Sequence, residues 1–158
     1  MKYIFIVLLA LHTGLFSKEL KITSDIFSAD ENEGISVFQG NVNIIKRNDE
    51  LNASEVTIYT NKKNKPTKFI ATGNVSFLIE TKQGARYSGV ANKVIYFPIK
   101  KEYHFFHNVH LKQLNEKKEI QGDEVVLQIT NGKAYAKGVV TKPVIMIFEI
   151  PEEKDEEK

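Results

Sequence analysis

Three histidines at three-residue intervals, His104, His107 and His110, are the residues of this 158-residue chain whose spacing first suggests a metal site. Imidazole is a common zinc ligand. Apolar residues recur at odd-numbered positions around them, at Tyr103, Phe105, Val109 and Leu111, which predicts a β-strand. On a strand, His104 and His110 share one face at a separation of about 20 Å, and His107 points to the other face. We therefore expect two surface histidines, one inward-facing histidine and no metal site.

Acidic residues raise the alternative of an enzyme that cleaves envelope glycans. Such hydrolysis needs two carboxyl groups on opposite sides of a cleft. Asp25, Asp30 and Glu31 are candidates, but Asp30-Glu31 lies in a predicted turn and no residue is placed to supply the second acid. The chain also lacks a Gly-x-Ser-x-Gly elbow, a phosphate-binding loop and a His-Glu-x-x-His motif. We predict a protein that is not an enzyme and uses no cofactor.

Cysteine and charge narrow the possible ligands and partners. The chain has no cysteine, which excludes disulfides and thiolate metal ligands. Its 22 basic and 20 acidic residues give a formal net charge of +2 at pH 7. The lysines gather in predicted turns, for example Lys62-Lys63, and no nucleic-acid-binding module is recognisable. We expect solvated turn lysines and no nucleic-acid partner.

The two ends of the chain differ in composition from the body. Met1-Lys2 is basic, and the apolar run 3–11 is too short to span a bilayer. Residues 1–17 therefore have the layout of a secretory signal peptide, with cleavage expected after Ser17. The alternative is an uncleaved membrane anchor. We expect residues 18–150 to form one exported domain in the periplasm and residues 151–158 to be a charged, disordered tail.

The stretch 69–79 carries the clearest structural pattern of the body. At period 2, one face holds Phe69, Val75 and Phe77, and the opposite face is polar in its middle. This alternation is typical of a half-buried β-strand. The stretch is centred on Gly73-Asn74-Val75, which lies in the middle of the pattern.

Two short signatures related to this stretch alternate along the chain. The first combines a small residue, a polar residue, a charged residue and Ile or Val, and it begins at Thr23, Ala53, Ala91 and Gly122. The second is Gly-Asn-Val or a variant, at residues 40–42, 73–75, 107–109 and 138–140. Copies of the first signature are 30, 38 and 31 residues apart, which allows two strands per repeat. We predict an all-β chain of tandem two-strand repeats, with each inward glycine marking a bend or bulge.

The apolar face of these strands is the predicted interior. It is lined by side chains from both kinds of strand: Phe38, Val42, Ile44, Val56, Ile58, Phe69, Val75, Phe77, Val94, Tyr96, Phe105, Val109, Leu111 and Leu127. The terminal strands are predicted to be unpaired edges that associate with another sheet. Their candidate contact residues are Ile22, Ile26, Val140 and Ile145, of which Ile22 and Ile26 are also expected on the inward face.

The ordered series of signatures, with the export signal and no cysteine, resembles the OstA-like family of LptA lipopolysaccharide-transport proteins over residues 23–140. His107 and Val139 depart from the Gly-Asn pattern. The resemblance implies an open β-jellyroll whose apolar groove, lined by the residues listed above, holds the acyl chains of lipopolysaccharide. It also implies head-to-tail homo-oligomers that bridge an inner-membrane LptC-like complex and an outer-membrane LptD-like complex.

Three other interpretations remain open from the sequence. A membrane-anchored LptC-like component would share the fold and would retain residues 1–17. A structural β-repeat protein would use the same aromatic residues to fill a dry core. Within the carrier hypothesis, Lys62, Lys63 or Arg86 could bind lipid phosphates at the rim of the groove, although turn lysines more often serve solubility.

Overall fold

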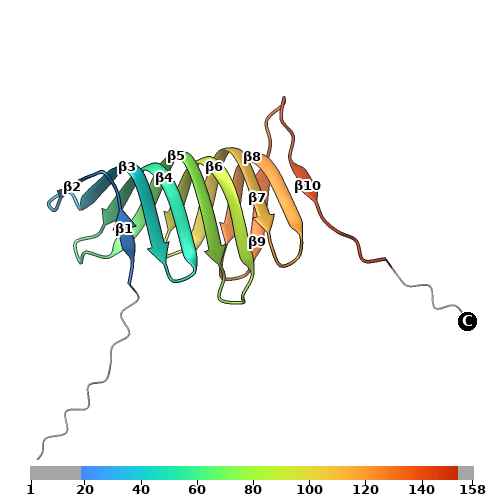
Figure 1. The fold of residues 1–158 in the computed structure, drawn as a ribbon, viewed down its shortest axis with the longest axis horizontal. Coiled ribbons are helices and arrows are strands. Elements are labelled where there is room, and N and C mark those ends of the chain that lie inside the picture. Colours follow the sequence, from blue (N-terminus) through green and yellow to red (C-terminus); the bar gives the residue numbers. More distant parts are fainter. Residues whose placement is uncertain (1–18, 153–158) are drawn as a thin grey trace, which may run out of the picture.

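The computed structural model describes residues 19–152, which form one ten-stranded antiparallel sheet (Figure 1). The predicted signal peptide, residues 1–17, and most of the predicted tail lie outside the described residues. The strands are β1 (Lys21–Thr23), β2 (Ile26–Asp30), β3 (Ile35–Lys46), β4 (Asp49–Thr60), β5 (Pro66–Glu80), β6 (Arg86–Phe97), β7 (Glu102–Gln113), β8 (Lys118–Gln128), β9 (Lys133–Lys137) and β10 (Ile145–Ile147). From β3 to β8, each strand pairs with the next one in the chain. The all-β prediction is confirmed, and the described residues contain no helix that could cross a membrane.

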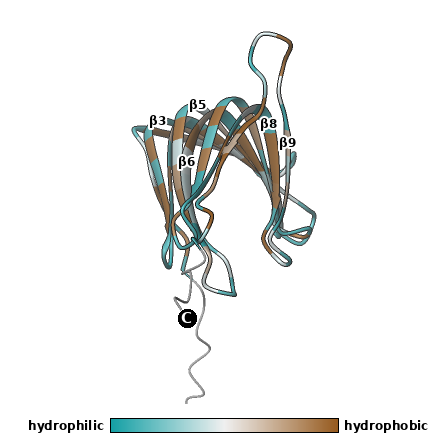
Figure 2. Cartoon of the chain, turned by 90° about the vertical axis from the view of Figure 1, so that its right-hand side faces the viewer, coloured by the Kyte–Doolittle hydropathy of each residue, from teal (hydrophilic) through white to brown (hydrophobic). Residues whose placement is uncertain are grey.

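The sheet is folded over along a single crease. The register shifts at Gln39/Val42, Asn52/Glu55, Thr72/Val75, Val90/Lys93 and Phe106/Val109. These irregularities fall on the two signatures and line up from strand to strand. Viewed along the sheet, the strands bend there and form an arch that is open on the opposite side (Figure 2). Each long strand therefore contributes one half to each of two facing layers.

Backbone conformation explains why the second signature bends the strand. Gly40 and Asn41 have φ values of 77° and 46°, and Gly73 and Asn74 have values of 84° and 46°. Glycine and asparagine are the residues that adopt this left-handed region most readily. A Cβ atom on Gly73 would also lie 2.5 Å from Cβ of Ser54. The predicted bulge at each Gly-Asn pair is confirmed.

The two departures from the Gly-Asn pattern have different outcomes. His107 and Asn108 keep the left-handed pair, with φ values of 62° and 51°, so the crease continues through β7. Gly138, in contrast, leads into a tight hairpin in which Val139 and Lys142 exchange two backbone hydrogen bonds of 2.9 Å. The crease therefore ends before Gly138, because the chain turns back there.

Side chains of the first signature hold the neighbouring bulges. The Asn41 amide donates a 2.8 Å hydrogen bond to Asp25. The Ser54 hydroxyl donates a 3.2 Å hydrogen bond to the carbonyl of Gly73. His107 Nδ1 lies 3.2 Å from a carboxylate oxygen of Asp123. The two signatures thus act together, since one supplies the bend and the other supplies a polar contact to it.

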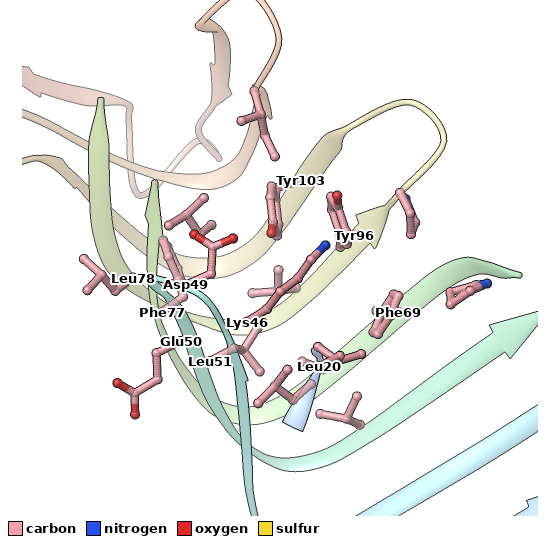
Figure 3. Close-up of a pocket in the computed structure, with 18 residues that line it drawn as sticks. Leu20, Lys46, Asp49, Glu50, Leu51, Phe69, Phe77, Leu78, Tyr96 and Tyr103 are labelled. Atoms are coloured by element: carbon pink, nitrogen blue, oxygen red, sulfur yellow. The ribbon is translucent and has the colours of Figure 1, made fainter. Parts of the chain in front are cut away.

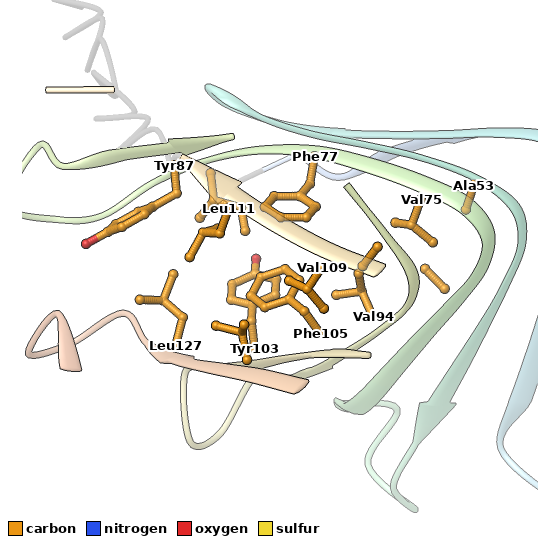
Figure 4. Packing of buried hydrophobic residues seen from close by; sticks show 14 of the residues in the cluster. Ala53, Val75, Phe77, Tyr87, Val94, Tyr103, Phe105, Val109, Leu111 and Leu127 are labelled. Carbon is orange, nitrogen blue, oxygen red and sulfur yellow. The ribbon is translucent and has the colours of Figure 1, made fainter. Parts of the chain in front are cut away.

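The core fills the space between the two layers. Phe105, Val125 and Leu127 are fully buried in the layer formed by the second halves of β6 and β8 and the first half of β7. Phe105 and Leu127 face Phe77 and Leu111 from the other layer, as the close-up of the buried side chains shows (Figure 4). The rings of Phe77 and Phe105 stack at a centroid distance of 4.5 Å. Interlayer packing of this kind stabilises the folded sheet.

At each end of the sheet, two short strands take the place of one long strand. At the N-terminal end, β1 and β2 pair with the two halves of β3. At the C-terminal end, β10 and β9 pair with the two halves of β8. The outer sides of these four strands have no partner strand within residues 19–152.

Two predictions for these ends are wrong. Ile26 was expected on the inward face with Ile22, but Phe27 lies on that face. Phe27 pairs with inward Phe38, and the two ring centroids are 4.9 Å apart. The break between β1 and β2 shifts the alternation by one residue. Val140 was expected in an edge strand, but it lies at the tip of the hairpin and is fully exposed.

Candidate functional site

An apolar cavity of about 380 Å³ opens between the two layers in the N-terminal part of the arch (Figure 3). Its floor is formed by apolar side chains of β3 to β6, including Leu51, Phe69, Phe77 and Tyr96. Phe69 and Tyr96 are only half-buried, so they present ring surface to the cavity. The volume and lining are typical of a site for an apolar ligand.

The predicted groove residues all lie in the interior, either in the buried core or packed against it. The structure divides them into two groups. Those that line the cavity are Ile44, Val56, Phe69, Phe77, Val94 and Tyr96. Those that belong to the packed core without lining the cavity are Phe38, Val42, Ile58, Val75, Phe105, Val109, Leu111 and Leu127. The inward assignment of these side chains is confirmed, and their contact with a ligand stays a prediction.

A group of stacked aromatic rings marks the inner boundary of the cavity. Tyr103 stacks on Tyr96 at a centroid distance of 4.3 Å and on Phe105 at 5.9 Å. Burial raises the pKa of the Tyr103 hydroxyl well above its ordinary value, and a negative charge on Tyr96 would raise it further. Tyr103 is therefore neutral at physiological pH. Beyond these rings, the space between the layers is occupied by Leu111, Val125 and Leu127.

The mouth of the cavity is polar, in contrast to its floor. Lys46 extends from the end of β3 over the cavity towards Tyr96 (Figure 3). Asp49 lies at the start of β4, where its carboxylate accepts a 2.8 Å hydrogen bond from the Glu80 backbone N–H. Burial raises the pKa of the Asp49 carboxyl above its ordinary value of 3.8, although that hydrogen bond and Lys46 oppose the rise. The mouth therefore holds partly desolvated charges beside apolar surface.

Several lining residues were not among those predicted from the sequence. Leu20, Leu51, Tyr103 and Ile129 line the cavity. Leu51 lies on an inward face by the same alternation that identified the others, so period 2 could have found it. Lys46 and Asp49 carried no such signal, because they flank a turn and only the curvature of the sheet brings them to the mouth.

The histidines are arranged differently from the prediction in one respect. His104 and His110 lie on the outer face, at 2.6 Å and 2.8 Å from carboxylate oxygens of Glu102 and Glu119 respectively. His107 was expected to face inward, but the bulge turns it outward, where its side chain is 61% exposed. Within residues 19–152, no group of three or more His, Asp or Glu side chains could hold a metal ion.

Comparison with known proteins agrees with this arrangement. Residues 21–133 match the family model described as LptA/(LptD N-terminal domain) LPS transport protein. The fold is similar to the crystal structure of LptH from Pseudomonas aeruginosa, the LptA homologous periplasmic component of its lipopolysaccharide transport device. That similarity has a TM-score of 0.73 at 15% identity and covers 84% of this chain and 96% of LptH. No curated protein sequence matches the chain. Since the family model covers most of the chain, the protein belongs to the LptA/LptD N-terminal domain family of lipopolysaccharide-transport proteins.

Proposed function

We propose that the protein is a periplasmic carrier that binds lipopolysaccharide and forms part of a bridge from the inner to the outer membrane. The observation that carries this proposal is the apolar cavity between the two layers, which is open to solvent at a polar mouth. Burial of each methylene group is worth about 0.8 kcal/mol, so acyl chains need a continuous apolar surface to leave the membrane. Phe69 and Tyr96 offer such a surface while the sugars stay in water.

The two sheet ends support head-to-tail association of copies. In such a stack, β2 of one copy would lie beside β9 of the next, and β1 would lie beside β10. Both pairings would be antiparallel, as all pairings in the sheet are. Exposed Ile26 and Phe27 would meet the region of exposed Tyr135. Unpaired strand edges with exposed apolar side chains are typical of sheets that extend by strand addition.

Charge at the two ends also favours a head-to-tail order. Asp30, the last residue of β2, and Glu33, in the turn that follows it, are exposed. Lys133 and Lys137 are exposed on β9. Opposite charges on adjoining strands favour pairing of unlike ends over like ends. The same strand edges would pair with the terminal strands of related domains in LptC-like and LptD-like partners.

In-cell photocrosslinking tests the carrier role. A photoreactive residue would replace Phe69 in the cavity, Leu127 in the filled core or Asn74 on the exposed crease. We expect a lipopolysaccharide adduct at Phe69 and none at Asn74. Adducts at none of the three positions, in protein shown to be folded and exported, would favour the structural β-repeat interpretation. The mass of the exported protein would separate a cleaved carrier from an anchored LptC-like relative.

Association is tested by molar mass in solution. We expect wild-type protein to form larger species as its concentration rises. Lys133→Glu/Lys137→Glu should shift it towards the monomer, because the β9 edge would then repel the acidic β2 edge. Lys62→Glu/Lys63→Glu is the matched control, since it makes the same charge change in the turn between β4 and β5. Equal molar masses for both variants would contradict pairing through β9.

A further inference from the structure

A second cavity, of about 660 Å³, lies at the mouth and is lined by basic residues from both layers. Lys46 ends β3, Arg47 lies in the following turn, and Lys82 lies in the β5–β6 turn. Lys101 reaches the cavity from the β6–β7 turn, which belongs to the opposite layer. The three turns are far apart in the sequence, and the crease brings them to one opening.

This basic cavity adjoins the apolar cavity directly. Lys46, Asp49, Tyr96 and Ile129 line both. The residues that line only the first are largely apolar, and those that line only the second are largely polar. The two cavities together are therefore suited to one amphiphilic ligand, with its chains in the first and its headgroup in the second.

The charge balance of the basic cavity favours an anion. Four cations face two carboxylates, Asp49 and Glu80, so the lining carries a net charge of +2 when all are ionised. Both carboxylates are already engaged, because Asp49 accepts from the Glu80 backbone N–H at 2.8 Å and Glu80 accepts from the Asn48 amide at 3.0 Å. Among the described residues, Lys46, Arg47 and Lys82 form no ion pair shorter than 4 Å.

We propose that this cavity binds a phosphate group on the headgroup of the lipid whose acyl chains occupy the adjoining apolar cavity. The inference rests on the proposed function and adds the headgroup chemistry to it. A phosphate monoester carries a charge of about −1.5 to −2 at pH 7, which the lining can neutralise. Lys62, Lys63 and Arg86, which the sequence suggested for this role, line neither cavity.

The test compares lipid A with lipid A from which the phosphates have been removed. Displacement of a fluorescent apolar probe would report the affinity of each lipid for the full-length exported protein. We expect wild-type protein to prefer the phosphorylated lipid by roughly tenfold, since three exposed charge pairs each contribute a fraction of a kcal/mol. Arg47→Gln/Lys82→Gln changes two residues that line only the basic cavity. It should lower the preference to about twofold and leave the affinity for the dephosphorylated lipid unchanged.

The matched control is Lys62→Gln/Lys63→Gln, which removes the same charge from a turn outside both cavities. It should keep the preference. The preference of the wild type should also shrink as salt rises from 50 to 500 mM, because salt screens exposed charges over about 10 Å or less. This second measurement tests the proposal without any substitution.

The possible failures are distinguishable. Equal affinity of the wild type for the two lipids would overturn the phosphate site and leave the carrier role intact. Failure of both lipids to bind would overturn the proposed function together with this inference. Micromolar binding of inorganic phosphate, without any preference for the phosphorylated lipid, would assign the cavity to free phosphate and overturn the headgroup assignment.

Discussion

The Gln83 side-chain amide donates a 3.0 Å hydrogen bond to the backbone carbonyl of Thr130, and this bond joins the two lips of the arch. Gln83 lies in the turn after β5, and Thr130 lies in the turn after β8, so the residues belong to opposite layers. Thr130 also lines the basic cavity. The bond therefore spans the opening beside the cavities and opposes separation of the layers there.

Removal of this bond should speed ligand exchange. We expect Gln83→Ala to change the free energy of unfolding by no more than about 1 kcal/mol, because the bond is exposed. Release of a bound apolar probe, followed by stopped flow, should become faster. Gln39→Ala is the control, since Gln39 bonds Glu55 at 2.8 Å on the outer surface. Equal release rates for both variants would show that Gln83 does not restrain the mouth.

Introduction of a charge should have different effects at a half-buried residue and at a fully buried residue of the cavity lining. Phe69→Glu places a carboxylate at a half-buried cavity position, so the protein should stay folded and lose lipid binding. Phe77→Glu places it at a position that is 5% exposed and stacked on Phe105. An unpaired buried charge costs several kcal/mol, so this variant should unfold or melt at a much lower temperature. Calorimetry and probe binding would separate the two outcomes.

Glycine in the bulge should be required for two separate reasons. Gly73 and Gly84 have nearly equal φ values of 84° and 83°, but only Gly73 has a side chain within reach, that of Ser54. Gly84→Ala should cost about 1 kcal/mol of unfolding free energy, from backbone strain alone. Gly73→Ala should cost more, because its Cβ would also clash with Ser54, and Ser54→Gly should recover part of the loss. Urea denaturation measures all three; equal costs at Gly73 and Gly84 would rule out the clash.

At His107, in contrast, substitution by glycine should stabilise the protein. His107 holds a φ of 62° at the position where the other repeats have glycine. His107→Gly should raise the free energy of unfolding by up to about 1 kcal/mol, since the exposed contact with Asp123 contributes little. A lower midpoint in urea for His107→Gly would show that this contact outweighs the strain.

Asp49 should make stability fall as pH rises. Its pKa is raised in the folded protein, so its stabilising contribution is present below the ordinary value of 3.8 and is lost as pH rises through the higher folded value. Asp49→Asn should lack this loss.

Glu102 should show the opposite slope, because the hydrogen bond with His104 lowers its pKa and its contribution is lost as pH falls below 4.5. Urea midpoints of Asp49→Asn and Glu102→Gln, compared with wild type from pH 3 to 7, test both signs.

The sequence by itself determined the strands, the inward face of most of them and the positions of the crease. These features depend on local physics, because alternation assigns a side chain to a face and Gly-Asn pairs adopt left-handed backbone readily. Both pairs, Gly40-Asn41 and Gly73-Asn74, do so here. Where the alternation crosses a bulge or a break, as at His107 and Ile26, the assignment by period 2 was wrong by one residue. The chemistry of turns likewise could not reveal that Gly138 starts a hairpin instead of another bulge.

Only the tertiary structure decided which part of the interior is open and what surrounds its mouth. Phe69, Phe77 and Leu127 follow the same alternation. Phe69 and Phe77 border the cavity, whereas Leu127 is fully packed. That difference depends on how side chains of two facing layers fill the space between them. Lys46, Lys82 and Lys101 are neighbours of the same cavity only because the folded sheet brings three separate turns together, and no local pattern encodes that distance.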